Sequence, residues 1–134
     1  MAIKFDTATR NAEMDAVTTR VGTSARLRVY NGTRPANPGT AITSQTMLVE
    51  LTCNATAFAP AASGGVLTAN AISNGTAAAT GTASWFRLFQ SNGTTAIVDG
   101  DVGTSGSDLN LNNTSIATSQ TVSVTSFAIT EGNA

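Results

Sequence analysis

The densest apolar cluster in the chain constrains its fold more than any other feature. That cluster, Trp85-Phe86-Arg87-Leu88-Phe89, is followed by a short polar segment and then by a second apolar run, Ala96-Ile97-Val98. Asn92-Gly93 lies between the two runs, and both residues tolerate the positive φ that a tight primed turn requires. The pattern predicts a central hairpin with strands at Thr82–Gln90 and Thr95–Asp99, against which the rest of the chain packs.

Other segments also have the residue pattern of β-strands. Ala25–Tyr30 alternates, with its apolar residues on one face and Arg26, Arg28 and Tyr30 on the other. In Thr121–Glu131 the apolar residues change parity, so a β-bulge is expected near Thr125-Ser126. Further strands are expected at Met47–Cys53 (with Leu48 facing away from the core), Gly65–Ser73 and 109–112, and a turn region at Gly100–Asp108. These turn spacings predict an all-β fold, a single β-sandwich or jelly roll of about 7–8 strands.

One short N-terminal helix is predicted over Asp6–Val21. Asp6 or Thr7 can cap its first turn, apolar residues recur at helical spacing, and Gly22 suits the position after its end. A chain of 134 residues is long enough for one core. We therefore expect an N-terminal arm and helix over residues 1–24 and a β-sandwich over residues 25–134, forming one domain overall.

The chain has few charged residues. Only 11% are charged, against 41% hydrophobic, and the formal net charge is −1. Such a surface favours lasting contact with other proteins, because Ser and Thr lose little side-chain entropy on ordering. The basic residues fall mainly in the first quarter, but nearby acids dilute them and no Lys/Arg run is present. We expect no binding of nucleic acid, and expect the arginines to pair with acids within the fold or on neighbouring chains.

No arrangement of residues indicates catalysis or a cofactor. The chain contains no histidine, which excludes the Ser-His-Asp and Cys-His arrangements. Its one lysine, Lys4, lies in the expected N-terminal arm, and no Gly-rich phosphate loop follows a strand into a helix. We therefore expect a protein that is not an enzyme.

A calcium site is the one metal hypothesis that the sequence raises. Asp99, Asp101 and Asp108 lie on a Gly-rich segment, and Ca²⁺ prefers hard oxygen ligands. The EF-hand pattern fails, since Gly103 and Asn110 occupy ligand positions. Linked turns in which Asp and Ser side chains bond their own backbone are the favoured interpretation, and no metal or other cofactor is expected.

The remaining features point to a cytoplasmic site of synthesis. Cys53 stands alone in an apolar run, so we expect a buried free thiol. The first residues are charged early, which is not the pattern of a secretory signal, and no apolar run has the length of a membrane span. Neither secretion nor membrane association is predicted.

Four segments together resemble a known family. They are Ala25-Arg-Leu-Arg-Val-Tyr-Asn-Gly-Thr33, Gly81-Thr-Ala-Ser-Trp-Phe-Arg-Leu88, Asp99-Gly-Asp-Val-Gly-Thr-Ser-Gly-Ser-Asp-Leu-Asn-Leu111 and Val122-Ser-Val-Thr-Ser-Phe127. They are similar to small virion proteins of tailed bacteriophages, and resemble specifically the jelly-roll cement (decoration) proteins on capsids of short-tailed phages that infect Gram-negative bacteria. The resembling motifs are turns and strands, so they identify a family without marking a site.

The resemblance implies a structural role. Cement proteins bind the outside of the phage major capsid protein and bridge neighbouring capsomers against internal DNA pressure. The family implies a homodimer or homotrimer on the capsid surface of the virion, made in the host bacterial cytoplasm. Our hypothesis is that the arm Ala2–Phe5, with Lys4 and Phe5, and the helix, with Arg10 and Arg20, contact the capsid. The face carrying Trp85, Arg87 and Phe89 would make the self-contact.

Two alternatives remain open at this stage. A virion adhesion or tail-fibre module that binds cell-surface glycans would have a similar composition, with Trp85 and Arg87 as an exposed carbohydrate platform. Few aromatic side chains are available to bind a sugar, since the chain has one Trp and one Tyr. A bacterial surface sandwich is disfavoured because no secretory signal is apparent.

Overall fold

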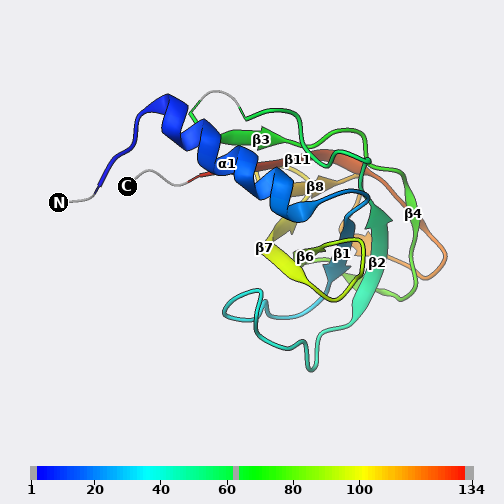
Figure 1. The fold of residues 1–134 in the computed structure, drawn as a ribbon. Helices are drawn as coiled ribbons and strands as arrows, with labels where there is room; N and C mark the ends of the chain where they lie inside the picture. Colours follow the sequence, from blue (N-terminus) through cyan, green and yellow to red (C-terminus); the bar gives the residue numbers. More distant parts are fainter. Residues whose placement is uncertain (1–2, 62–63, 132–134) are drawn as a thin grey trace.

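The computed structural model describes residues 3–61 and 64–131, which form one helix and a set of mostly short strands. The helix is α1 (Thr7–Val21). The strands are β1 (Arg26–Tyr30), β2 (Met47–Thr52), β3 (Val66–Thr68), β4 (Gly75–Thr76), β5 (Gly81–Thr82), β6 (Trp85–Phe89), β7 (Ala96–Gly103), β8 (Leu109–Leu111), β9 (Ser115–Ile116), β10 (Thr121–Val122) and β11 (Val124–Thr130). The fold is mostly β with a single short helix in the described ranges (Figure 1).

Seven of these strands form a mixed sheet that curls on itself. Their order is β2-β1-β6-β7-β8-β11-β3, and every neighbouring pair is antiparallel except β7 and β8. The remaining strands form two small pairs, β10-β4 and β5-β9. Phe86 on β6 and Phe127 on β11 lie edge to face with 5.1 Å between ring centroids, although two strands separate them in the sheet. The sheet must therefore curl so that β6 faces β11 (Figure 1).

The inside of the curl holds the main hydrophobic core. On β1, Leu27 lies opposite Leu51 of β2 and Leu88 of β6, and all three side chains are buried. Met14 and Val21 of α1 belong to the same cluster. The helix and the sheet therefore share one core.

Both edges of the large sheet are covered. At the β2 edge, the Ala78 N–H donates to the Leu48 carbonyl at 2.7 Å. At the β3 edge, the Ala59 N–H donates to the Thr68 carbonyl and the Asn70 N–H to the Ala57 carbonyl. Uncovered strand edges invite pairing with other chains, so this cover removes a route to aggregation.

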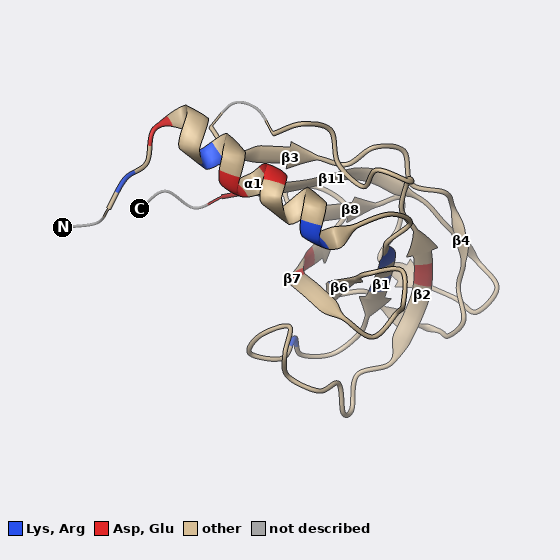
Figure 2. Ribbon diagram, viewed as in Figure 1, with Lys and Arg blue, Asp and Glu red and all other residues tan. Residues whose placement is uncertain are grey.

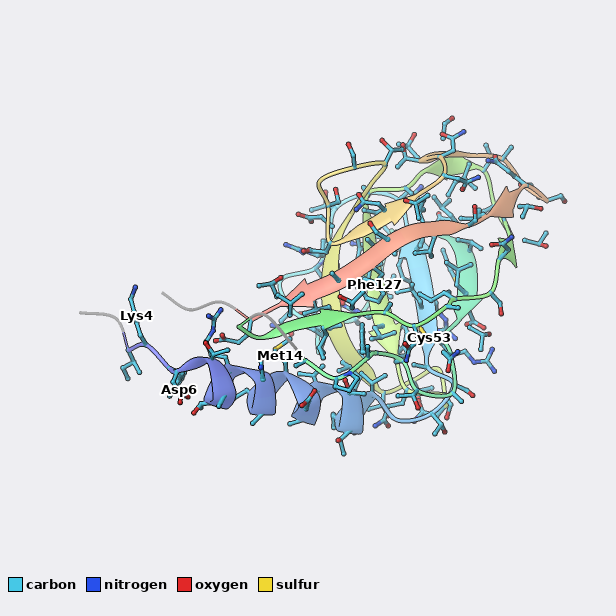
Figure 3. All side chains as sticks on the ribbon, turned by 90° about the horizontal axis from the view of Figure 1, so that it is seen from above. Lys4, Asp6, Met14, Cys53 and Phe127 are labelled. Atoms are coloured by element: carbon cyan, nitrogen blue, oxygen red, sulfur yellow. The ribbon has the colours of Figure 1, made fainter. Side chains whose placement is uncertain are left out.

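The helix begins and ends as its sequence predicts. The Asp6 side chain accepts a hydrogen bond from the Thr9 N–H at 2.9 Å, which is N-capping. Gly22, with φ of +76°, follows the last turn and donates to the Thr18 carbonyl. In Figures 1 and 3, α1 runs beside β3.

The predicted central hairpin is confirmed as β6 and β7, but its turn is not the tight primed turn that Asn92-Gly93 suggested. Gly93 has φ of +71° and Asn92 does not have positive φ. The Asn92 Oδ1 instead accepts hydrogen bonds from the N–H groups of Thr94 and Thr95. These local side-chain bonds satisfy the backbone of a wider loop, which removes the need for a primed turn.

The second hairpin strand is longer than predicted, because β7 extends to Gly103, into the first part of the segment Gly100–Asp108 that was predicted as a turn region. Gly100 lies directly opposite Phe86 on β6. A Cβ on Gly100 would lie 2.5 Å from the Phe86 ring, so the ring occupies the space that a side chain would fill. Packing of an aromatic ring over a strand glycine keeps the strand regular where composition alone predicts a turn.

Three further predictions need adjustment. The predicted strand Gly65–Ser73 is reduced to β3, since only Ala69 makes a further isolated bridge. Leu48 is fully buried, not outward, because a bulge between Val29 and Tyr30 shifts the β1–β2 register past it. The closing strand divides at Ser123 into β10 and β11.

The bulge predicted near Thr125-Ser126 is confirmed. The β11–β8 register shifts between Val124 and Ser126, so that Phe127 faces the core while Val124 also packs against it. One extra residue reconciles the two parities of apolar residues in this strand.

The close approach of Gly100 and Phe86 predicts a specific coupling. Gly100→Ala should destabilise the protein by about 1–3 kcal/mol, because the added methyl group overpacks against the ring. In a Phe86→Leu background the same change should cost less, since the ring is gone. Urea unfolding of the four variants measures this double-mutant cycle. Strictly additive effects would contradict the packing argument.

Candidate functional site

The predicted site residues on the central hairpin lie on the outer face of the sheet, defined here as the face that carries Tyr30, Trp85, Arg87 and Phe89. Cross-strand pairing places a row of charges across four strands there: Glu50 of β2, Arg28 of β1, Arg87 of β6 and Asp99 of β7. Residues directly opposite in antiparallel strands share a face. The row therefore carries two inner cations, each beside an outer carboxylate.

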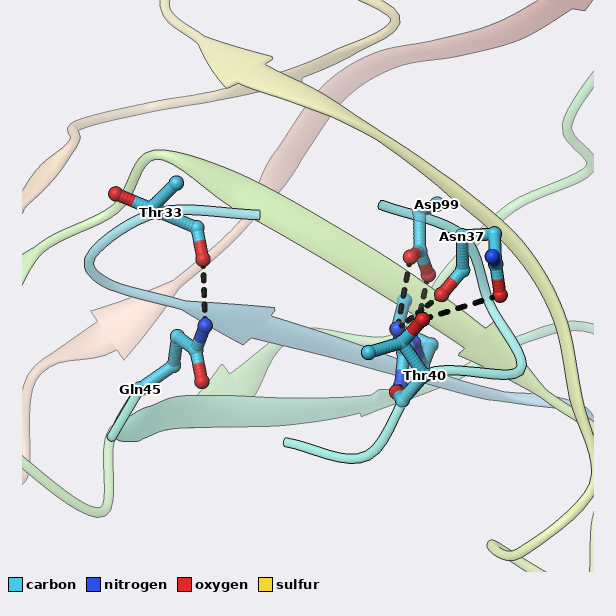
Figure 4. Close-up of polar contacts among 6 residues, drawn as sticks. Thr33, Asn37, Thr40, Gln45 and Asp99 are labelled. Carbon is cyan, nitrogen blue, oxygen red and sulfur yellow. Dashed lines mark hydrogen bonds and ion pairs between the residues drawn. The ribbon is translucent and has the colours of Figure 1, made fainter. Parts of the chain in front are cut away.

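Arg87 is the most highly connected side chain of this face. Its Nε and Nη2 donate to the two carboxylate oxygens of Asp99 at 2.7 and 2.8 Å, and both side chains are at most 5% exposed. Its Nη1 donates to the Thr40 carbonyl at 2.8 Å, and Nη2 donates to the Asn37 carbonyl at 3.1 Å. Figure 4 shows Asp99, Asn37 and Thr40 converging on this point. The pair thus fixes residues 37–40 of the β1–β2 loop over the sheet.

An aromatic stack lies next to this pair. Tyr30 and Trp85 are stacked with 4.6 Å between centroids, and the indole Nε1 donates to the Asn31 carbonyl at 3.1 Å. The Arg87 guanidinium lies 5.4 Å from the centre of the Trp85 ring, a cation–π arrangement. Trp85 is only 1% exposed. It is therefore not the exposed carbohydrate platform that the sequence left open.

The three residues of the predicted self-contact are all buried within the protomer. Phe89 lies under the Arg28 guanidinium, 4.7 Å from the ring centroid. Trp85, Arg87 and Phe89 have their contacts in the β1–β2 loop and the neighbouring strands. Any self-contact on this side of the molecule would have to use the surrounding surface instead.

A second cluster places two arginines on one carboxylate. Glu50 accepts from Arg26 Nη1 at 2.7 Å and from Arg28 Nε at 2.6 Å, and Arg28 also donates to the Gly93 carbonyl. Burial raises the pKa of Glu50, but the hydrogen bonds and charges of Arg28 and Arg26 outweigh it and leave that pKa below its usual range. The cluster ties the start of β1 to β2 and to the β6–β7 turn.

A groove of about 460 Å³ lies between the β1–β2 loop and β7. Its lining residues are Arg34, Pro35, Ala36, Asn37, Pro38, Ile97, Val98 and Asp99. Arg34 pairs with Asp101 at 3.3 Å, and both side chains are well exposed. Asp99 is held by Arg87, so the groove offers apolar walls and one exposed cation, Arg34, which is already paired with Asp101.

The three acids of the calcium hypothesis are separately engaged. Asp99 pairs with Arg87 and Asp101 with Arg34, while the Asp108 carboxylate accepts the Asp101 N–H at 3.2 Å. Across residues 3–61 and 64–131, no group of three His, Cys, Asp or Glu residues is placed to hold a metal ion. Only Asp108 bonds the backbone of its own segment, as the turn interpretation expected; Asp99 and Asp101 instead pair with arginines from β6 and the β1–β2 loop.

Cys53 is a buried free thiol. Burial raises its pKa to about 11. A thiolate is the reactive form of cysteine, and this site disfavours it at neutral pH.

The predicted capsid-contact residues divide into two groups. The Arg10 Nε donates to the Glu131 carboxylate at 2.7 Å and its Nη2 to the Glu131 carbonyl, so Arg10 anchors the helix to the end of β11. Lys4, Phe5 and Arg20 are exposed, in the arm and at the end of α1. Ala2, the first residue of the predicted arm, lies outside the described residues.

The charges without an ion-pair partner concentrate on one part of the molecule. Within the described ranges, the ion pairs include Arg10, Arg26, Arg28, Arg34 and Arg87, which leaves Lys4 and Arg20 unpaired. Most of the unpaired acids are also here: Asp6, Glu13 and Asp15. We call residues 3–21 the arm–helix surface. Figure 2 shows both signs of charge along α1 while much of the sheet is uncharged.

Sequence reasoning missed Glu50, Asn37 and Thr40 as partners of the arginines. The available signal was parity, because Arg26 and Arg28 fall on strand positions opposite the apolar residues of their strand. Two arginines on one strand face require nearby acceptors, and Glu50 was the acid at the matching parity of the next strand. The loop carbonyls carried no such signal.

Comparison with known proteins adds no match: no family model, no curated protein and no solved structure matches this chain. No helix in the described part of the chain has the length and apolar character needed to cross a membrane. The functional argument therefore depends on the residues and their geometry.

The buried Arg87–Asp99 pair predicts a large loss of stability when one partner is removed. Arg87→Gln should cost about 3–5 kcal/mol, because it leaves the Asp99 charge buried and unpaired. The control is Arg34→Gln, which removes an exposed arginine with the same change of charge and should cost at most about 1 kcal/mol. Guanidinium unfolding measures both. Equal effects would show that the buried pair does not hold the loop.

The lowered pKa of Glu50 predicts a pH-dependent contribution to stability. A carboxyl with a lower pKa in the folded than in the unfolded state stabilises the fold above its unfolded value, here about 4.5, and loses this contribution as the pH falls through the folded value. The stability difference between the wild type and Glu50→Gln should therefore be present at pH 7 and shrink below about pH 4.5.

Thermal unfolding across this range measures the difference. Glu13→Gln is the matched control, since Glu13 lies exposed on α1 outside any ion pair of the described residues, and it should show no such pH dependence. A constant difference for Glu50→Gln would contradict the argument.

Proposed function

We propose that this chain is a non-catalytic structural protein of a bacteriophage virion, which binds the outside of the capsid and cements neighbouring capsomers. The proposal begins from the resemblance of four segments to phage cement proteins. Those segments contain all of β1 and β8, most of β6, and parts of β7 and β11. These strands are consecutive neighbours in the sheet, so the resemblance covers the contiguous centre of the fold.

The observation that carries the proposal is the separation between matched and unmatched charges. The sheet uses its arginines internally, whereas the arm–helix surface carries Lys4 and Arg20 and several acids outside any ion pair of the described residues. Unmatched charges on an exposed surface can pair with a partner protein and set its orientation. We therefore assign this surface to protein contact, with the phage major capsid protein as the partner of its Arg20 end.

A rigid body suits this role. Both sheet edges are covered and the β1–β2 loop is fixed by Arg87, so the covered sheet offers few segments that would need ordering on attachment. Attachment that orders few groups loses little entropy. In a repeated shell, modest contacts per copy add up to lasting attachment.

In this proposal the curled sheet is a β-sandwich of the jelly-roll type. The rings of Phe86 and Phe127 meet across the core, which supports two facing layers from one curled sheet. The protein would be made in the host cytoplasm and reside on the capsid surface, as a homodimer or homotrimer.

The decisive experiment adds the purified protein to expanded, DNA-filled capsids that lack it. We expect density bridging capsomers in a cryo-EM map and release of DNA at a higher temperature than from bare capsids, followed by a DNA-binding dye. Density elsewhere on the particle, or no attachment, would overturn the proposal.

A charge reversal tests which surface attaches. Arg20→Glu should weaken attachment about tenfold or more, because it places a like charge in the contact. The matched control is Arg34→Glu, which reverses an exposed arginine outside the arm–helix surface and should leave attachment unchanged. Co-sedimentation with capsids at several salt concentrations gives both affinities. Equal losses would show that α1 does not face the shell.

A further inference from the structure

The two exposed large hydrophobic side chains of the described residues lie within three positions of the arm. Ile3 is 78% exposed and Phe5 is 45% exposed. Lys4, between them, has no ion-pair partner in residues 3–61 and 64–131. Figure 3 places Lys4 beyond the start of α1 and away from the sheet. Single exposed apolar residues are ordinary, but their concentration in one projecting segment indicates a contact.

A complementary hollow lies at the other half of the helix. It has a volume of about 240 Å³ and is lined by Asp15, Thr18, Thr56, Phe58, Ala59 and Pro60. Phe58 is buried and forms part of its apolar wall. A cavity of about 150 Å³ holds a benzene molecule, so this hollow has room for a branched aliphatic or aromatic side chain.

The rim of the hollow carries the charge opposite to that of the arm. One carboxylate oxygen of Asp15 accepts the Ala61 N–H at 2.6 Å, and Asp15 forms no ion pair in the described part of the chain. Its negative charge complements Lys4. An apolar side chain beside one cation therefore matches an apolar hollow beside one anion.

The arm cannot reach the hollow of its own chain. Asp15 lies nine residues after the cap residue Asp6, which is about 13 Å along the helix axis. The chain from Asp6 back to Ile3 spans at most about 10 Å. Figure 1 shows that this segment leads away from the helix. An arm docked in this hollow therefore belongs to another molecule.

We propose that the arm, residues 3–5, of one copy docks into the hollow formed by α1 and residues 56–60 of a second copy. Ile3 enters the hollow, and Lys4 pairs with Asp15 of the other copy. When both copies do this reciprocally, the two arms exchange about a twofold axis, with the α1 helices side by side. This inference concerns two copies of the chain and does not depend on the capsid role; it assigns the arm to self-contact and leaves Arg20 for a shell.

The chain offers a sharp test because Lys4 is its one lysine. A mixture of unlabelled and ¹⁵N-labelled full-length protein is treated with a zero-length carbodiimide cross-linker, which joins an amine to a carboxylate in contact. We expect a Lys4–Asp15 cross-link whose two peptides carry mixed labels, together with a dimer mass in native mass spectrometry.

Two variants of α1 form a matched pair for this test. Asp15→Asn should abolish the mixed-label cross-link while keeping an oxygen that can accept the Ala61 N–H. Glu13→Gln, two residues away on the same helix, should leave the cross-link intact. The reverse result would overturn the proposal.

A third variant tests the apolar half of the contact. Ile3→Asp should weaken dimerisation at least about tenfold in analytical ultracentrifugation while leaving the thermal unfolding of the monomer unchanged, because Ile3 lies outside the core. A monomeric wild type, or cross-links of Lys4 that form only after capsids are added, would show that the arm serves another partner and that the proposal is wrong.

Discussion

The arrangement of this protein depends on the buried ion pair between Arg87 and Asp99. Burying two charges is costly unless each is fully hydrogen-bonded, and here the guanidinium also donates to the carbonyls of Asn37 and Thr40. One side chain therefore links β6, β7 and the irregular β1–β2 loop. The loop in turn covers Trp85, whose indole N–H donates to Asn31 at the start of the same connection.

This pair explains how β6 can be buried on both faces without a second apolar layer. All five residues of β6 are buried, yet Phe86 and Leu88 face the main core while Trp85, Arg87 and Phe89 face the loop and the neighbouring arginines. The sequence of a strand that is buried on both faces is normally a continuous run of apolar residues. In β6 the second face is instead aromatic and cationic, since aromatic rings and guanidinium groups stack favourably.

Local features of the fold could be predicted from the sequence, and long-range ones could not. The helix with its Asp6 cap, the β6–β7 hairpin and the bulge between Val124 and Ser126 follow from spacing and parity within a few residues. The parallel pairing of β7 with β8 and the burial of Leu48 depend on contacts between distant segments, which periodicity does not encode. The candidate site divides in the same way. Parity separated Arg28 from the apolar face of its own strand and grouped Arg87 with Trp85 and Phe89, but nothing local showed that these strands would pair or that a proline-containing loop would cover them.

The small number of charged residues also limits how this protein can recognise a partner. A chain with only 11% charged residues that pairs five of its seven cations internally has few left for recognition. The two others, Lys4 and Arg20, flank α1, and Arg10 holds that helix to the sheet through Glu131. The helix is thus fixed to a rigid body and carries charges of both signs that have no ion-pair partner in residues 3–61 and 64–131. Because exposed charges gain little from pairing within one molecule but orient an approaching partner, this distribution favours an adhesive role over a solvated, non-interacting surface.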